Sequence, residues 1–263
     1  MSQRTAVLAL LGAAMLSAQT DSPVVGIGPF LHIVSDLDRS LAFYHDELGL
    51  ELTGPPGEHK FTDNPAVANL YGVPGKQFRA AVLKIPGSAM GIELVQWGEA
   101  RTPTMRMVDP GVVSLLLRVT ASSHAPRGIL HDPDGYFVVV EQSENAGADL
   151  SVTVRDIQKT AALYTEALGL KTDGEWLTIP ETSVRLRLMK ALVNDGLTVA
   201  FPEPGRGMLR LPVHNIAALT ESLKSAGVSV ITTGGAPVSL PQGPRVIILR
   251  DPNNFYLQLM ETR

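Results

Sequence analysis

The sequence predicts a mixed α+β fold in which one unit, built from βαβββ modules, occurs twice in tandem. The segment "VSDLDRSLAFYHDELGL" (34–50) matches "VRDIQKTAALYTEALGL" (154–170). A second match pairs "LHDPDGYFVVVEQ" (130–142) with "LRDPNNFYLQLME" (249–261). Both matches are offset by about 120 residues. Self-similarity at a fixed offset indicates a repeated structural unit.

The first unit begins with an apolar strand and a helix. Asp36 stands where a helix N-cap is expected, because its carboxylate can accept hydrogen bonds from the free N–H groups of the first turn. Leu41, Tyr44 and Leu48 then recur at helical spacing, and Gly49 ends the helix.

Strands follow this helix. The segments 78–85 ("FRAAVLKI") and 91–97 ("GIELVQW") are short, rich in β-formers and bounded by Gly or Pro. A new strand begins within 111–120, and the second unit restarts a strand and a helix over 208–231. Residues 120–128 are too few for the helix that the pattern expects there. The second half-module of the first unit is therefore predicted to be trimmed.

These patterns divide the chain into a first domain, 25–143, and a second domain, 148–263. The join is the small, polar stretch "SENAGA" at 143–148. Residues 1–20 differ from both domains: one basic residue, Arg4, precedes an apolar run over 6–16 and then small residues. This is the layout of a secretory signal peptide, with an apolar run too short to span a membrane. The alternative is an N-terminal helix packed on the domain.

Composition limits the partners and the compartment. The net charge is −4 and no run of Lys or Arg is present, which argues against nucleic acid as a partner. The chain has no cysteine, so neither a disulfide nor a cysteine nucleophile exists. An exported protein without disulfides suits a bacterial periplasm or exterior, so we expect a secreted or periplasmic protein of bacterial type.

The repeated helix segment, "GIELVQWGEA" (91–100) and "DPDGYFVVVEQ" (132–142) resemble the vicinal oxygen chelate superfamily. That superfamily includes glyoxalase I, bleomycin-resistance proteins and extradiol dioxygenases. The resemblance spans residues ~25 to 261, nearly the whole chain after the signal peptide. It implies paired βαβββ modules that curl into a cup, in which four strand residues, usually His, Glu or Gln, hold one divalent metal. It does not imply one activity, since the fold hosts enzymes and pure binders.

The metal ligands that the resemblance implies are mostly missing. Counting from the helix caps and the DP turns places them at eight positions: Pro29, Glu93, Ser114, Val139, Asp149, Thr198, Met208 and Gln258. Among these, Glu93, Gln258 and Asp149 are the candidate metal ligands. Glu141 lies two residues beyond Val139 on the same strand face, nearer the rim. The cofactor expectation is therefore none, or one divalent metal.

His32 is a residue type that binds metals, but its position in the strand argues against a metal-binding role. It lies in the apolar strand before Asp36, and alternation turns it to the same side as Phe30 and Val34, toward the helix. We expect a core histidine whose ring nitrogen has a partner within the protein, not a ligand.

Further candidates line the cups. The segment 60–77 is expected to cap the first cup with Phe61, Leu70 and Tyr71, which suits an apolar guest. Arg79 is a possible partner for Glu93 from the neighbouring strand. Arg185, Arg187 and Arg210 either line the second cup or point outward from a half-exposed strand. The predicted ligand-binding residues are Glu93, Glu141, Arg79, Tyr71 and Arg210.

Three functions compete. The leading one is an exported protein that binds a small, partly apolar molecule in its β-cup, with a largely degenerate metal site. The alternative is a metal-dependent enzyme of the glyoxalase, epimerase or dioxygenase type, so enzymatic activity stays open. The third is an interaction module that uses only its surface. The expected partners are a small-molecule ligand and, as an open possibility, a second copy in a homodimer, with no nucleic acid and no membrane span.

Overall fold

The computed structural model describes residues 22–54, 59–98, 106, 108–193, 202–241 and 243–262. The predicted signal peptide, residues 1–20, lies outside them. No helix in the described ranges is long and apolar enough to cross a membrane.

Strands dominate the described residues. In chain order the elements are β1 (Phe30–Ile33), α1 (Leu37–Leu41), the π-helix η1 (Ala42–Glu47), β2 (Glu51–Thr53), α2 (Pro65–Leu70), β3 (Phe78–Lys84), β4 (Gly91–Trp97), β5 (Val113–Val119), β6 (Gly128–His131), β7 (Phe137–Gln142), β8 (Gly147–Val154), α3 (Ile157–Glu166), β9 (Lys171–Asp173), β10 (Trp176–Thr178), β11 (Arg185–Lys190), β12 (Gly207–Val213), α4 (Ile216–Ser225), β13 (Ser229–Val230), β14 (Val238–Ser239), β15 (Arg245–Arg250) and β16 (Tyr256–Glu261). The mixed α+β class and the tandem modules predicted from the sequence are confirmed.

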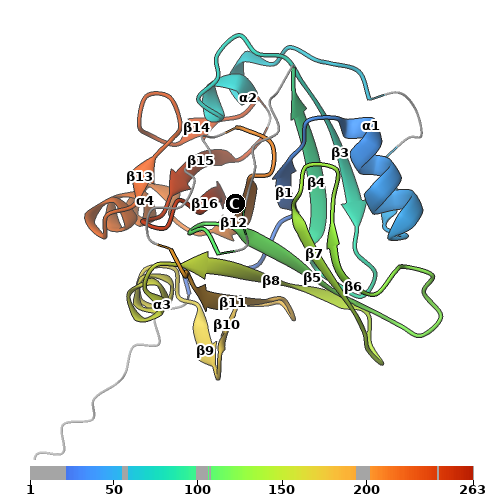
Figure 1. Ribbon diagram of the computed structural model, residues 1–263. Coiled ribbons are helices and arrows are strands. Elements are labelled where there is room, and N and C mark those ends of the chain that lie inside the picture. The colour runs from blue at the N-terminus through green and yellow to red at the C-terminus, as the bar shows by residue number, and fades with distance from the viewer. Residues whose placement is uncertain are drawn as a thin grey trace, which may run out of the picture.

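The strands form two sheets, and each sheet combines both sequence repeats (Figure 1). One sheet has the order β13-β15-β16-β12-β1-β4-β3-β2, with β14 paired to β15. The other has the order β6-β7-β5-β8-β11-β10-β9. The first module (β1 to β4) thus shares a sheet with the fourth (β12 to β16), and the second (β5 to β7) shares the other sheet with the third (β8 to β11). The predicted boundaries, 25–143 and 148–263, separate the sequence repeats, whereas both sheets cross them.

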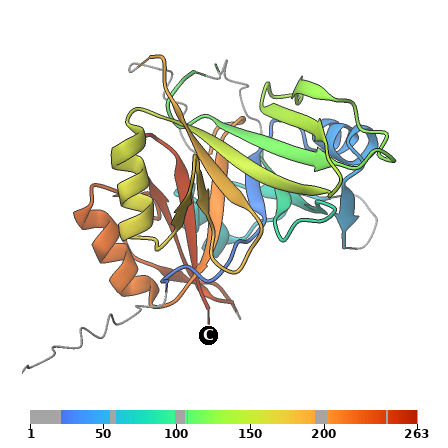
Figure 2. The same cartoon turned by 90° about the horizontal axis from the view of Figure 1, so that it is seen from below.

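Each sheet is joined at its centre by the first strands of two modules. β1 runs antiparallel to β12, with Leu31 opposite Met208. β5 runs antiparallel to β8, with Ser114 opposite Ser151. The helices α3 and α4 of the second repeat lie together, and α1 lies at the opposite end of the molecule (Figure 2).

Each sequence repeat contains a turn that begins with Asp-Pro, here called the DP turn, at Asp132 in the first repeat and Asp251 in the second. A tyrosine of the helix donates a hydrogen bond to this aspartate. Tyr44 Oη donates to Asp132 Oδ2 at 3.2 Å, and Tyr164 Oη donates to Asp251 Oδ2 at 2.9 Å. The other oxygen of each carboxylate accepts backbone N–H groups of its own turn. Both oxygens of each buried carboxylate therefore have hydrogen-bond partners. These two aspartates therefore hold together modules that lie in different sheets.

His32 belongs to the same buried system, as expected of a core histidine. Its side chain is fully buried, with Nε2 2.6 Å from Asp132 Oδ2 and Nδ1 3.3 Å from the Arg206 carbonyl oxygen. Both ring nitrogens therefore have partners inside the protein. The prediction of a core histidine with partners inside the protein is confirmed.

Two local predictions can be compared with the structure. Asp36 caps α1 by accepting from the N–H groups of Asp38 and Arg39, and Gly49 ends the helical segment at φ +74°. The predicted single helix is instead a short α-helix followed by the wider π-turn η1. Residues 120–127 contain no helix, so the trimmed half-module is confirmed.

Candidate functional site

One face of the nine-stranded sheet, here called the cup face, carries a hydrophobic cluster separate from the main core. Leu31, Val95, Trp97 and Met208 belong to this cluster, which packs beneath α2. Strand side chains alternate, so Glu93 lies on the same side of β4 as Val95 and Trp97. A carboxylate is therefore placed among apolar side chains.

Arg210 links Glu93 to Gln258 across the floor of the cup. Arg210 and Gln258 are direct neighbours on β12 and β16, and Arg210 Nε donates to Gln258 Oε1 at 2.6 Å. Arg210 Nη2 lies 2.5 Å from Glu93 Oε2 in an ion pair. Burial lowers the pKa of the Arg210 guanidinium, but the charge of Glu93 and the contact with Tyr71 outweigh it and raise the net pKa. The guanidinium thus stays charged.

The contacting side chains of Glu93, Arg210 and Gln258 are here called the polar row. Tyr71, at the C-terminal end of α2, covers the polar row from above. Burial raises the pKa of the Tyr71 hydroxyl, the Glu93 charge raises it further, and Arg210 only partly opposes them. Tyr71 therefore stays protonated and acts as a neutral polar group beside the ion pair. A phenol in that state is a poor general base.

Apolar walls complete a cavity of about 160 Å³ over the polar row. Its lining residues are Val67, Leu70, Tyr71, Phe78, Glu93, Val95, Trp97, Arg210, Leu240 and Gln258. The lid comes from both repeats: α2 packs against β14 and β15 (Figure 1), and Thr233 N donates to the Asn69 carbonyl oxygen at 3.2 Å. The cavity therefore exists only because the first and fourth modules share a sheet.

Four residues predicted from the sequence meet in this cavity: Glu93, Tyr71, Arg210 and Gln258. Leu70 also lines it, as expected for the capping segment, but Phe61 does not. Phe61 is 42% exposed and lies against Arg79, whose guanidinium carbon is 5.3 Å from the ring centroid.

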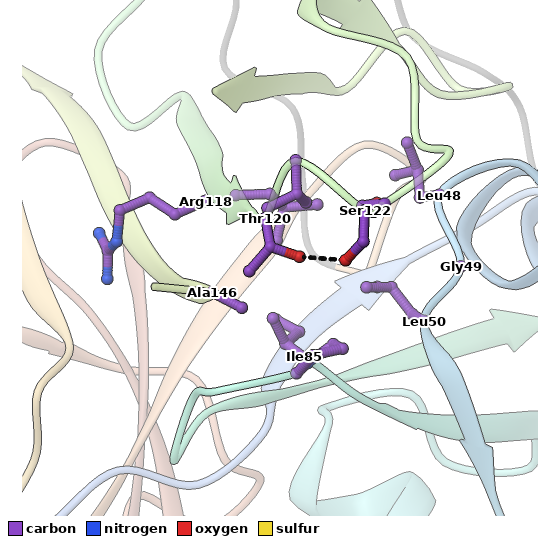
Figure 3. Close-up of a pocket in the computed structure, with 12 residues that line it drawn as sticks. Leu48, Gly49, Leu50, Ile85, Arg118, Thr120, Ser122 and Ala146 are labelled. Atoms are coloured by element: carbon purple, nitrogen blue, oxygen red, sulfur yellow. Dashed lines mark hydrogen bonds between the residues drawn. The ribbon is translucent and has the colours of Figure 1, made fainter. Parts of the chain in front are cut away.

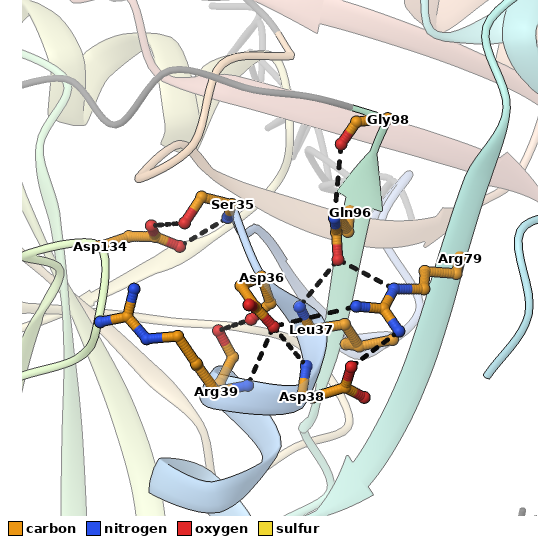
Figure 4. Close-up of polar contacts among 10 residues, drawn as sticks. Ser35, Asp36, Leu37, Asp38, Arg39, Arg79, Gln96, Gly98 and Asp134 are labelled. Atoms are coloured by element: carbon orange, nitrogen blue, oxygen red, sulfur yellow. Dashed lines mark hydrogen bonds and ion pairs between the residues drawn. The ribbon is translucent and has the colours of Figure 1, made fainter. Parts of the chain in front are cut away.

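Arg79 lies on the opposite face of the sheet and contacts the start of α1 (Figure 4). Its Nε donates to Gln96 Oε1 at 2.9 Å, and its Nη1 pairs with Asp38 at 3.0 Å. Gln96 Oε1 also accepts from Leu37 N at 2.9 Å. The suggestion that Arg79 pairs with Glu93 is wrong, because Arg79 is opposite Gln96 and shares that residue's side of the sheet.

Asp149 and Glu141 belong to the other sheet. Asp149 is 1% exposed and is paired with Arg118 and Arg185. Arg185 also covers the Trp176 ring, with 4.3 Å between the guanidinium carbon and the ring centroid. Glu141 is exposed near the end of β7. The structure does not bring either residue to Glu93 and Gln258, so the three candidate metal ligands do not form one site.

A second cavity, of about 230 Å³, lies where β5 ends (Figure 3). Leu48, Leu50 and Ile85 line it, together with backbone of the following loop and a hydrogen bond of 3.0 Å between the Thr120 and Ser122 hydroxyls. The Arg118 guanidinium is turned away from these residues and pairs with Asp149. None of the lining residues drawn in Figure 3 therefore points a charged group into this cavity.

Comparisons with known proteins agree with this architecture. Residues 148–259 match the model of the Glyoxalase/Bleomycin resistance protein/Dioxygenase superfamily. The second repeat belongs to this superfamily. The relationship predicted from the sequence is thereby confirmed. No curated protein sequence matches the chain significantly.

Solved structures extend the superfamily fold over both repeats. Glyoxalase I from Zea mays is 14% identical, with a TM-score of 0.56 and coverage of 90% of this chain and 92% of that one. A putative dioxygenase from Bacillus subtilis is 17% identical, with a TM-score of 0.58 and coverage of 91% and 86%. The cppA protein from Streptococcus pneumoniae is 16% identical, with a TM-score of 0.50 and coverage of 91% and 99%. These likenesses concern the fold.

The residues of the cup do not fit the divalent metal that the superfamily implies. Of the four implied ligand positions in the nine-stranded sheet, Pro29 and Met208 offer no hard donor, and Glu93 and Gln258 already hold the Arg210 guanidinium. The described ranges contain no group of three or more His, Cys, Asp or Glu that could hold a metal ion. Thr198, an implied position for the other sheet, lies outside these ranges.

Sequence reasoning missed most of the apolar wall. Phe78, Val95 and Trp97 on β3 and β4 line the cavity, and Leu240 comes from the turn after β14. Val95 and Trp97 were accessible from the sequence, because they follow Glu93 at strand spacing. Leu240 had no such signal, since its place depends on how the fourth module packs under α2.

Proposed function

We propose that this protein binds a small, partly apolar organic molecule in the cavity of the nine-stranded sheet. The observation that carries the proposal is the row Glu93–Arg210–Gln258 at the floor of an otherwise apolar cavity. Binding sites for small molecules are typically apolar hollows with a few polar groups that orient the ligand. The row supplies such groups, and the side chains of α2, β3 and β4 supply the apolar surface.

Binding without a metal is part of this proposal. Arg210 provides a fixed positive charge between the two oxygen donors, and a divalent cation placed there would meet both a like charge and occupied donors. This argues against the alternative of a metal-dependent enzyme of the glyoxalase, epimerase or dioxygenase type. The degenerate metal site thus supports a binding protein over an enzyme.

A thermal-shift screen with a matched pair of variants tests the proposal. Compounds that stabilise the wild-type protein are tested on Leu240→Trp, which fills the cavity, and on Leu192→Trp, which adds the same side chain at a position that is 79% exposed. Stabilisation is expected to persist in Leu192→Trp and to vanish in Leu240→Trp. Ligands that stabilise all three proteins equally would overturn the assignment to this cavity.

Export is a separate part of the proposal. The apolar run at 6–16 behind Arg4 and the absence of cysteine support secretion or a periplasmic location. Expression of the full chain in a bacterium, followed by fractionation and N-terminal sequencing, tests it. If the protein is exported, it is expected outside the cytoplasm without its N-terminal signal peptide. Protein with an intact N-terminus in the cytoplasmic fraction would contradict export.

A further inference from the structure

Trp97 presents a hydrogen-bond donor that the protein does not use. The side chain lies at the end of β4 and lines the cavity, and the residue is 2% exposed. Its indole Nε1 is buried and has no hydrogen-bond partner within the described part of the chain. A buried N–H without an acceptor is costly, and indole N–H groups usually find a partner when buried.

The indole ring is held in place by its neighbours. The Tyr71 ring lies 5.1 Å from the Trp97 ring, and the Phe78 ring lies 4.9 Å from it, measured between centroids. Tyr71 is itself fixed beside Glu93 and Arg210. Both flanking rings belong to the cavity wall, so the indole that carries this unpaired donor is held in a fixed orientation at that wall.

The charge and size of the cavity limit what can supply that acceptor. Glu93 and Arg210 neutralise each other, so the described lining carries no net charge and favours an uncharged ligand. A cavity of about 160 Å³ is close to the roughly 150 Å³ that holds one benzene molecule in an engineered apolar core. One six-membered ring with a small substituent therefore fills it.

We propose that the ligand is an uncharged single-ring molecule with an oxygen acceptor, and that the Trp97 indole N–H recognises this oxygen. The proposal rests on the proposed function, since it names the ligand class of the same cavity. It makes Trp97 the residue that selects among apolar rings of equal size. Glu93, Arg210 and Gln258 form the polar end of the cavity, while the Trp97 indole N–H donates to the oxygen of the ring substituent.

Two probes of the same shape test this selection. Acetophenone carries a carbonyl oxygen where α-methylstyrene carries a CH₂ group, so the two rings differ in one acceptor. Their dissociation constants are measured by ligand-observed NMR for the wild-type protein, for Trp97→Phe and for Trp176→Phe. Trp176 is the second of the two tryptophans and lies in the other sheet, against Arg185. Circular dichroism checks that each variant is folded.

The ratio of the two dissociation constants is the decisive quantity, because it cancels general losses of affinity. We expect the preference for acetophenone to fall about fivefold in Trp97→Phe, as for one lost hydrogen bond, and to persist in Trp176→Phe. An unchanged ratio in Trp97→Phe would overturn the role of Trp97 and leave small-molecule binding intact. If the wild-type protein bound neither probe, the single-ring class would be wrong, while the library screen above would still decide whether the cavity binds another molecule.

Discussion

Arg210 and Glu93 come from opposite sequence repeats, yet the guanidinium Nη2 lies 2.5 Å from the carboxylate Oε2. The pair exists because β1, beside the Glu93 strand, and β12, which carries Arg210, join the first and fourth modules. It closes the floor of the cavity and takes up the charge that would otherwise attract a cation.

Removing only Arg210 is expected to destabilise the fold. In Arg210→Met the Glu93 carboxylate loses its positive partner in a mostly buried position, at a cost of about 2 kcal/mol in the free energy of unfolding. The double variant Arg210→Met/Glu93→Gln removes both charges and is expected to recover most of this loss. Urea unfolding of the wild type, both single variants and the double variant measures the coupling. Simply additive losses would show that the pair contributes nothing to stability.

The response to metal ions is expected to reverse when Arg210 is replaced by an acidic residue. Wild-type protein should gain no thermal stability from Mn²⁺, since Arg210 fills the space between Glu93 and Gln258. Arg210→Glu places a second carboxylate there, and oxygen donors suit this ion. The variant is expected to be less stable without metal and to be stabilised by millimolar Mn²⁺, as measured by differential scanning fluorimetry. Stoichiometric Mn²⁺ binding by the wild type, lost in Glu93→Gln, would contradict our interpretation of the site.

Acid is expected to weaken the first DP turn. Burial raises the pKa of Asp132, but the charge of His32 and hydrogen bonds from His32, Tyr136 and Asp134 outweigh it, so the net pKa is lowered. A lowered folded-state pKa means that the carboxylate stabilises the fold above its unfolded value, about 3.9, and that this stability is lost as the pH falls through the folded-state pKa. Asp132→Asn should therefore be less stable at pH 7 and show a flatter loss of stability below pH 4. Parallel pH profiles for variant and wild type, from urea unfolding, would count against this role.

The second DP turn is expected to show the opposite sign. Burial raises the pKa of Asp251, and the hydrogen bonds from Asn253, Phe255 and Tyr164 only partly oppose it. With a raised folded-state pKa, the stabilising contribution is fully present below the unfolded value, about 3.9, and is lost as the pH rises through the folded-state pKa. Asp251→Asn should thus lower stability more at acidic pH than at neutral pH relative to the wild type. The same unfolding series measures this, and a loss that grows toward neutral pH would refute it.

Much of the local structure was predictable because it depends on neighbours along the chain. The N-cap at Asp36, the glycine that ends the helix and the strand 91–97 follow from side-chain chemistry and spacing within a few residues. The burial of His32 followed from strand alternation. The shape of the helix after Leu41 did not, since the π-turn η1 is a matter of backbone hydrogen bonds that periodicity does not distinguish.

The site was predictable residue by residue but not as an assembly. Glu93, Tyr71, Arg210 and Gln258 were each candidates, and all four line one cavity. The partner suggested for Glu93 was Arg79, the residue on the adjacent strand of its own module, and the true partner is Arg210 from the other repeat. Asp149, the third candidate metal ligand, lies in the other sheet and is paired with Arg118 and Arg185.

The sequence by itself determined the modules, their tandem repetition, their caps and turns, and the side of each strand that carries polar residues. Only the tertiary structure decided that the first module shares a sheet with the fourth and the second with the third. The physical reason is that strands pair through backbone N–H and C=O groups, which every residue except proline carries alike. Side-chain patterns therefore define what a strand buries, whereas the choice of its neighbour, and with it the meeting of Glu93 and Arg210, depends on the packing of the whole chain.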